Sequence, residues 1–366
     1  MSPGFDPQAF FPARLGAAAA KAKRDYRQLL NLSSNELFHP AAAERLRRLV
    51  ASWPVSLKYP YWPEASRRVG EACGLSGDEC LLAAGSDAAI KWLLDSLAGE
   101  ERTVLLPWPT YEGYEQYAAL AGLRIARLPH RGLDGGRLVA ALGREAQRHP
   151  SGVVAIANPN GFSGAGLPLP ELAALADACA RAGCLLVIDE AYAAFAPLDA
   201  SPLCRTHDNV LVVRSFSKSL GLAGLRIAAM LGSPRLLRRL APTHPFHPVS
   251  DIAQHCLLGC LADRGTTEAI LADVRAWRAA LQADLAGLDP GWRVEAGAAN
   301  FVLVDLGSAS DRVRLVQGLA ERGIAVKDLG GTDGFETCVR ITVPGDGERR
   351  RLLAALEEIV PEAQRR

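Results

Sequence analysis

The segment LLVIDEAY at residues 185–192 runs an unbroken apolar stretch directly into Asp189. Apolar runs without polar alternation are typical of strands that are covered on both faces. Similar runs recur between residues 103 and 231, and amphipathic stretches separate several of them. Strands that alternate with helices predict an α/β fold, in which a mostly parallel sheet carries helices on both faces. The predicted strands are 103–106, 125–128, 153–157, 185–188, 210–213 and 227–231, and the predicted helices are 86–97, 111–121 and 169–182.

The pattern changes after about residue 240, where Pro242, Pro245 and Pro248 interrupt the chain. Beyond them the sequence predicts helices over 251–285, 311–322 and 348–360, and strands over 300–305, 324–327 and 339–343. This mixture indicates a smaller α+β domain. We therefore expect a large α/β domain at residues 40–245 and a small α+β domain made of residues 1–39 and 246–366.

Composition excludes several classes of protein. Lysine and arginine (41) nearly balance aspartate and glutamate (40), so the net charge predicts neither nucleic acid nor a membrane as a partner. The first 20 residues lack the pattern of a secretory signal, and no run of 18 apolar residues could span a bilayer. The 8 cysteines are scattered without framework spacing. We expect reduced thiols and a cytoplasmic protein.

Reactive side chains follow two of the predicted strands. Asp189 comes directly after one, where burial would be costly unless the carboxylate meets a cation or several donors. The next strand leads into Arg214, Ser215, Ser217 and Lys218. Because open α/β sheets present ligands at the carboxyl ends of their strands, we expect these groups to lie near one another.

This set of groups suits a phosphorylated pyridine aldehyde, pyridoxal 5'-phosphate. A buried lysine amine such as that of Lys218 becomes nucleophilic and can form a Schiff base. A carboxylate such as that of Asp189 keeps the ring nitrogen protonated. Hydroxyls and an arginine bind phosphate, and Arg226 follows the glycines of the next turn, Gly221 and Gly224.

A second anion-binding element lies earlier in the chain. Gly85 precedes a predicted helix that begins with Ser86 and Asp87, and the free N–H groups of a helix start bind anions. Tyr111 opens another helix and supplies an aromatic ring that could stack on a pyridine.

With these motifs together, the chain resembles the fold-type I pyridoxal-phosphate aminotransferases of class I/II, and within them the histidinol-phosphate aminotransferase-like group. The matching segments extend from about residue 33 to residue 343. In chain order they are Ser34-Asn35-Glu36, Tyr59-Pro60, Gly85-Ser86-Asp87, Pro109-Thr110-Tyr111, Asn158-Pro159-Asn160, Asp189-Glu190-Ala191-Tyr192, Ser215-Phe216-Ser217-Lys218, Gly221-Leu222-Ala223-Gly224-Leu225-Arg226, Ala299-Asn300-Phe301 and Arg340-Ile341-Thr342-Val343.

The resemblance implies a role for each matched residue. Lys218 would be the Schiff-base lysine and proton shuttle, and Asp189 the partner of the ring nitrogen. Tyr192 would donate to the ring hydroxyl, and Tyr111 would stack on the ring. The implied phosphate-binding residues are Ser86, Asp87, Ser215, Ser217 and Arg226.

The resemblance also implies a substrate site and a partner. Arg340 would bind an anionic group of the substrate, with Lys327 and Asn35 as further substrate-binding residues. Tyr59 would reach the phosphate of a neighbouring subunit, which predicts a homodimer. The small-molecule partners would be an amino donor and a 2-oxo acid acceptor.

One departure from the family pattern concerns the ring hydroxyl. The family usually reads Asn-Pro-Asn-Asn-Pro-Thr-Gly, whereas residues 158–164 read NPNGFSG, so Gly161 stands where the asparagine that binds the hydroxyl is expected. Either Asn160 takes over this contact or Tyr192 acts alone. An aromatic Tyr61 follows Tyr-Pro, and Lys327 stands where a second arginine is common.

Two alternative functions keep the cofactor. One is decarboxylation of a phosphorylated amino acid, as in threonine-phosphate decarboxylases, and the other is cofactor binding without turnover. A nicotinamide-dependent oxidoreductase would need a glycine fingerprint after a strand, which the sequence lacks. No metal is expected, because His244, His247 and His255 with the nearby cysteines lack zinc-site spacing.

Overall fold

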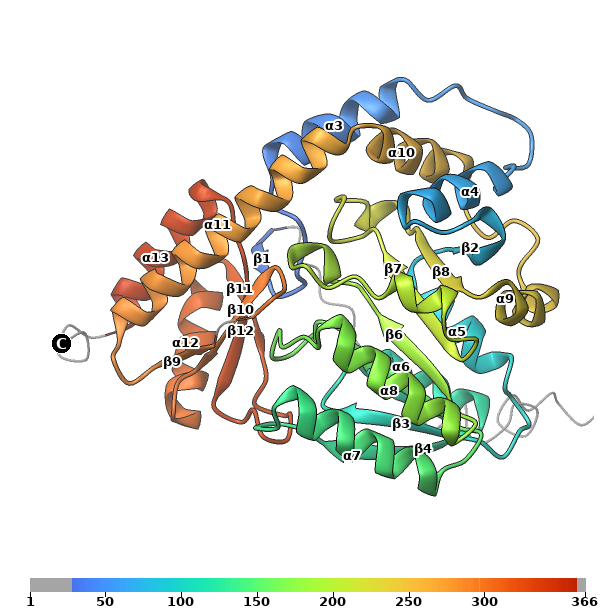
Figure 1. Ribbon diagram of the computed structural model, residues 1–366. Coiled ribbons are helices and arrows are strands. Elements are labelled where there is room, and N and C mark those ends of the chain that lie inside the picture. The colour runs from blue at the N-terminus through green and yellow to red at the C-terminus, as the bar shows by residue number, and fades with distance from the viewer. Residues whose placement is uncertain (1–27, 296, 361–366) are drawn as a thin grey trace, which may run out of the picture.

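The fold is built on two sheets, seen in a computed structural model that describes residues 28–295 and 297–360 (Figure 1). The larger is a 7-stranded sheet in the order β2-β8-β7-β6-β5-β3-β4, in which β8 runs antiparallel to both neighbours and the other pairs are parallel. Its strands are β2 (Cys80–Ala83), β3 (Thr103–Trp108), β4 (Arg124–Pro129), β5 (Val153–Ala157), β6 (Leu185–Asp189), β7 (Val210–Ser215) and β8 (Ala228–Gly232).

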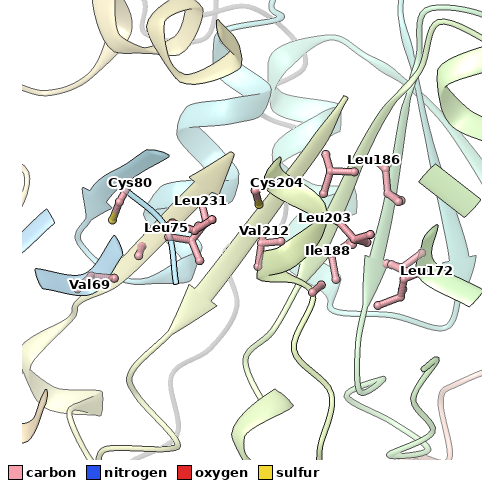
Figure 2. Packing of buried hydrophobic residues seen from close by; sticks show 14 of the residues in the cluster. Val69, Leu75, Cys80, Leu172, Leu186, Ile188, Leu203, Cys204, Val212 and Leu231 are labelled. Atoms are coloured by element: carbon pink, nitrogen blue, oxygen red, sulfur yellow. The ribbon is translucent and has the colours of Figure 1, made fainter. Parts of the chain in front are cut away.

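Helices cover both faces of this sheet, as the unbroken apolar runs predicted. Along β6, Leu186 and Ile188 contribute to one apolar cluster, whereas Val187 between them contributes to another on the opposite face. Figure 2 shows the first of these clusters, in which Leu172 of a covering helix packs beside Leu186 and Ile188. The covering helices are α4 (Pro63–Ala72), α5 (Ser86–Asp95), α6 (Glu112–Ala121), α7 (Gly135–Arg148), α8 (Leu169–Arg181), α9 (Pro234–Leu240) and α10 (Asp251–Ala262).

The second sheet is a 5-stranded one in the order β1-β11-β12-β10-β9, formed mainly by the C-terminal part of the chain. Its strands are β1 (Leu30–Leu32), β9 (Arg293–Glu295), β10 (Phe301–Asp305), β11 (Ile324–Asp328) and β12 (Cys338–Thr342). The helices α11 (Arg264–Leu288), α12 (Ala309–Glu321) and α13 (Asp346–Ile359) pack on it around a separate apolar cluster. The N-terminal β1 pairs in parallel with β11, so the beginning of the chain returns to this smaller sheet.

The predicted α/β class, with a mostly parallel sheet and a smaller α+β part, is confirmed. The region predicted to be helical over 251–285 consists of two helices, because the chain turns at Asp263, whose side chain accepts the Thr266 N–H and begins a new helix. The described chain also contains helix α3 (Pro40–Ala51); the helices α4, α7 and α9 and the strands β1, β2 and β9 were not predicted. The first 27 residues of the expected small domain lie outside the described part of the chain. Within that part, no helix is both long and apolar enough to cross a membrane.

Candidate active site

The carboxyl ends of three neighbouring parallel strands meet at one edge of the large sheet. The last residues of β5, β6 and β7, namely Ala157, Asp189 and Ser215, all line one cavity of about 330 Å³. This volume falls in the range of small-molecule sites, roughly 300–1,000 Å³. The other residues that line the cavity are Ser34, Ser86, Asp87, Tyr111, Glu112, Gly161, Phe162, Ala191, Tyr192, Ser217, Lys218, Ala223, Arg226, Lys327 and Arg340.

The antiparallel strand β8 brings Arg226 to this edge. Ala228, at the start of β8, pairs with Ser215, at the end of β7, so the residues just before β8 lie beside the residues just after β7. The Arg226 guanidinium donates from Nη1 to Ser217 Oγ at 3.3 Å and from Nη2 to Asp87 Oδ2 at 3.4 Å. The backbone of Arg226 is left-handed, with φ 52°. Two separate turns are therefore joined by one cation.

The start of α5 completes this positively polarised corner. Ala83, at the end of β2, pairs with Ala228, so the helix that follows also begins at the same edge. Gly85 caps it at φ 89°, and a Cβ atom there would overlap the Arg226 guanidinium. The helix start, the Ser215 and Ser217 hydroxyls and Arg226 thus bring together the kinds of donor that bind a phosphate-sized anion.

Asp189 supplies a buried acid to the cavity. It is 5% exposed, and its Oδ1 accepts the Ala191 N–H at 3.1 Å. Burial raises the pKa of Asp189 to about 7, although the Ala191 N–H partly offsets this. Among the described residues, no lysine, arginine or histidine forms an ion pair with this carboxyl group. A cationic ring N–H would supply the missing partner.

Lys218 brings a buried amine to the same cavity. Its Nζ donates to the backbone carbonyl of Ser34 at 2.7 Å. Burial lowers the pKa of Lys218 from an ordinary 10.5 to about 8; the charge of Glu36 opposes this shift, and those of Arg340 and Arg226 favour it. About a tenth of the amine is therefore neutral and nucleophilic at pH 7, far more than for an ordinary lysine.

Two tyrosines line the cavity between these groups. The Tyr111 hydroxyl donates to Asp87, and burial raises the pKa of Tyr111, with the Asp87 hydrogen bond adding to the effect. Tyr192 packs edge-on against Phe301, with ring centroids 5.5 Å apart, and its hydroxyl oxygen accepts the Asn35 Nδ2 donor at 2.8 Å. Each hydroxyl is thus fixed by a side chain from another part of the chain.

The small sheet contributes two cations. Arg340 on β12 is the register partner of Lys327 on β11, and both line the cavity. Arg340 donates to the carbonyls of Gly161 and Ser33, the latter at 2.9 Å, while its Nε has no hydrogen-bond partner among the described residues. Burial lowers the pKa of Arg340. A desolvated guanidinium bonded only to neutral carbonyls favours an incoming carboxylate or phosphate.

Three of the predicted site residues do not line the cavity. Asn160 binds its own loop: its Oδ1 accepts the Phe162 and Ser163 N–H groups, and its Nδ2 donates to the Pro109 carbonyl at 3.1 Å. Asn35 is 1% exposed and lies behind Tyr192. Tyr59 is 81% exposed and stacks on His247, with centroids 4.4 Å apart.

Arg214, which the sequence placed in the same group as Lys218, faces away from the cavity. Its guanidinium pairs with the buried Glu190 and with Asp199, and its Nη1 donates to the Cys73 thiol at 3.0 Å. Adjacent residues of a strand point to opposite faces. Since Ser215 faces the cavity, Arg214 cannot, and Arg226 is the arginine of the anion site.

Sequence reasoning missed several groups that complete the site. The Ser34 carbonyl, Glu112 and Phe162 line the cavity, and Thr342 binds Asn35 from behind. Glu112 follows Tyr111, so its place at the helix start was a usable signal. Ser34 and Phe162 lie in irregular loops that carry no local pattern. Within residues 28–295 and 297–360, no three His, Cys, Asp or Glu side chains gather as a metal site would require.

Comparison with known proteins matches this geometry. The model of the family "Aminotransferase class I and II" covers residues 27–359. Histidinol-phosphate aminotransferase 1 of Nostoc sp. is 31% identical over 91% of this chain and 92% of its own. The structure of histidinol-phosphate aminotransferase from Sinorhizobium meliloti with pyridoxal-5'-phosphate superposes with a TM-score of 0.79 at 25% identity, covering 98% of this chain and 95% of that one.

The fold is shared more widely. L-threonine-O-3-phosphate decarboxylase from Porphyromonas gingivalis superposes with a TM-score of 0.71 at 18% identity, over 90% of this chain and 99% of that one. At this identity the likeness concerns the fold alone. The family model, which covers almost the whole chain, and the 31% identical relative decide the family. This chain belongs to the class I and II aminotransferases.

Proposed function

We propose that this aminotransferase moves an amino group between a small anionic amine or amino acid and a 2-oxo acid, with Lys218 as the residue that holds and releases its cofactor. The cofactor is pyridoxal 5'-phosphate. The observation that carries the proposal is the presence, in one cavity, of a buried amine with a lowered pKa, a buried acid without a cationic partner and an anion site.

The residues present fit this cofactor at both of its polar ends. Its phosphate matches the corner made by Ser86, Ser215, Ser217, Arg226 and the start of α5. Its protonated ring nitrogen matches Asp189, because a cation beside a buried carboxyl group stabilises the charged form. When bound, the cofactor supplies an aldehyde that captures amines and a ring that accepts electrons.

The other side chains that line the cavity would contact the ring, transfer the proton and bind the substrate. Tyr111, whose hydroxyl donates to Asp87, would stack on the ring, and Tyr192, which lines the same cavity, would donate to the ring hydroxyl. Lys218, whose pKa is lowered to about 8, would be the base that takes a proton from the α-carbon of the amino donor. Arg340, with Lys327 beside it, binds an anionic group of the donor and fixes the geometry of this transfer.

We further propose a cytoplasmic homodimer with the domain boundaries expected above, 40–245 for the large domain and 1–39 with 246–366 for the small one. The free thiols of all the cysteines support a reducing compartment. The exposure of Tyr59 supports a role at a neighbouring subunit. Since relatives are named for histidinol phosphate, that amine belongs among the first donors to test.

A panel of amino donors tests the reaction. The enzyme loaded with cofactor is mixed with histidinol phosphate, glutamate, aspartate and phosphothreonine, and 2-oxo products and carbon dioxide are measured in parallel. We expect donor-dependent formation of an oxo product with an acceptor acid and no carbon dioxide. Release of carbon dioxide instead would indicate the decarboxylase alternative. A coloured protein that is inert with every donor and acceptor would indicate binding without turnover.

A further inference from the structure

The cavity wall beside Tyr192 carries one hydroxyl and no amide. Of the cavity-lining residues that follow β5 and β6, Gly161, Phe162 and Ala191 have no polar side chain, and Tyr192 does. The nearby amide of Asn160 is occupied by its own loop. Among the described residues that follow β5 and β6 and line the cavity, Tyr192 therefore has the only side-chain proton donor, and Arg340 of the small sheet bonds to the Gly161 carbonyl.

A tyrosine hydroxyl has a single proton, so its direction depends on its neighbours. Asn35 Nδ2 donates to the Tyr192 oxygen at 2.8 Å, which leaves the Tyr192 proton available for another acceptor. The orientation of the Asn35 amide is itself fixed. Thr342 Oγ1 accepts the backbone N–H of Asn35 at 3.0 Å and donates its own proton to the side-chain oxygen Asn35 Oδ1 at 3.3 Å.

The backbone of Asn35 is fixed as well. It adopts the left-handed conformation with φ 53°, which asparagine tolerates better than most residues. Its carbonyl accepts Asn300 Nδ2 at 3.0 Å, and the side chain is buried. Asn300 and Thr342 thus hold Asn35 so that its side-chain amide donates to the Tyr192 oxygen.

We propose that Asn35 is a positioning residue that turns the Tyr192 proton into the cavity, toward the ring oxygen of the bound cofactor. The inference rests on the proposed function, since it needs the cofactor to occupy this cavity. Because Gly161 offers no second donor, the ionisation of that ring oxygen depends on the Asn35–Tyr192 pair. In a cavity with a second donor at position 161, loss of the Tyr192 proton would have a smaller effect.

The test measures the visible absorbance of the cofactor-loaded enzyme as a function of pH. A donor stabilises the ionised oxygen and lowers the pH at which the spectrum changes. We expect Tyr192→Phe to raise that pH by about one unit or more. Asn35→Asp keeps the shape but replaces the donor by an acceptor, which draws the Tyr192 proton away, so it should cause a similar rise.

The double variant separates orientation from charge. If Asn35 acts through Tyr192, Asn35→Asp adds no further shift in the Tyr192→Phe background; an equal shift in both backgrounds would overturn the inference. Asn35→Gly, which suits φ 53°, removes the amide without adding charge and should give a smaller rise. The other charged groups around the cavity are the same in all variants: Asp87, Glu112, Asp189, Lys218, Arg226, Lys327 and Arg340.

A gain of function provides the matched control. A Cβ atom at Gly161 would lie 3.6 Å from the Tyr192 ring, an ordinary contact, so Gly161→Asn fits. In the Tyr192→Phe background, Gly161→Asn should bring the spectral transition back to lower pH. Failure to do so would contradict the inference that this side of the cavity normally depends on the Tyr192 proton. A protein that never forms a visible band dependent on Lys218 would refute the proposed function instead. A lowered melting temperature without a spectral shift would make Asn35 merely structural.

Discussion

At the scale of single residues, the behaviour of Lys218 follows from burial. Its buried amine donates a hydrogen bond to the Ser34 carbonyl, and the charges of Glu36, Arg340 and Arg226 act on it. Such an environment favours the neutral form of the amine, whose pKa falls to about 8. Compared with an amine of pKa 10.5, the neutral fraction at pH 7 is larger by roughly 300-fold.

This difference predicts how the cofactor-free protein captures pyridoxal phosphate. Labelling at Lys218, trapped by borohydride and measured by peptide mass spectrometry, should increase with pH up to about 8 and then level off. The exposed Lys91, paired with Asp95, serves as the control in the same sample and should continue to gain label at higher pH. The Lys218→Ala variant should lose the adduct, and its turnover should fall by roughly 10³-fold or more. Parallel labelling of both lysines would contradict the prediction.

At the scale of elements, the junction between β2 and α5 depends on a glycine. Gly85 combines a positive φ with the close approach of Arg226, whereas Gly99 has a similar φ of 85° with open space around it. Alanine at either position should cost about 1–3 kcal/mol of stability through backbone strain. Only alanine at Gly85 also pushes the Arg226 guanidinium out of place.

The two substitutions therefore form a matched pair. Gly85→Ala should weaken cofactor binding by tenfold or more, on the order of 1.4 kcal/mol, whereas Gly99→Ala should lower the melting temperature alone. Fluorescence titration of the cofactor-free variants measures the dissociation constant, and thermal unfolding measures the strain. Equal affinities for the two variants would show that Arg226 does not depend on the approach of Gly85.

The strands of the large sheet other than β2 were predictable, because most of them carry an apolar run that appears in the sequence. The site was predictable where it lies directly after such a run, as at Asp189 and Ser215. Arg214 was grouped with them because the sequence does not show where the strand ends. β7 extends to Ser215, so Arg214 and Ser215 still point to opposite faces of the sheet. Asn35 meets Tyr192 across 157 positions and Thr342 across 307, so no local pattern reveals its neighbours.

At the scale of the whole molecule, the cavity is closed by both sheets. Arg340 of the small sheet bonds to Gly161 of the large part, and the Ala298 N–H donates to the Gly164 carbonyl at 2.8 Å. Long helix α11 runs beside both parts (Figure 1). Contacts of this kind explain why residues from nearly the whole chain surround a single small cavity.

The proposed homodimer makes a prediction about two neighbouring tyrosines. Tyr59 and Tyr61 are 81% and 77% exposed, and the proposal assigns a cofactor contact in the partner's cavity to Tyr59 alone. Tyr59→Phe should weaken cofactor binding by about tenfold, the effect of one hydrogen bond to a charged group, whereas Tyr61→Phe should not. Light scattering should give twice the chain mass of 39.0 kDa. A monomer with full activity would contradict both parts.

The short segment that follows β1 bears on how the protein is made. Residues 33–35 supply the carbonyls that hold Arg340 and Lys218 and the amide that holds Tyr192. Among the described strands, β1 pairs only with β11, about 290 positions later in the chain. On the ribosome, where the N-terminal part emerges first, this segment must wait until almost the entire polypeptide has been translated. A nascent chain can assemble much of the large sheet early, but its catalytic pocket is completed last.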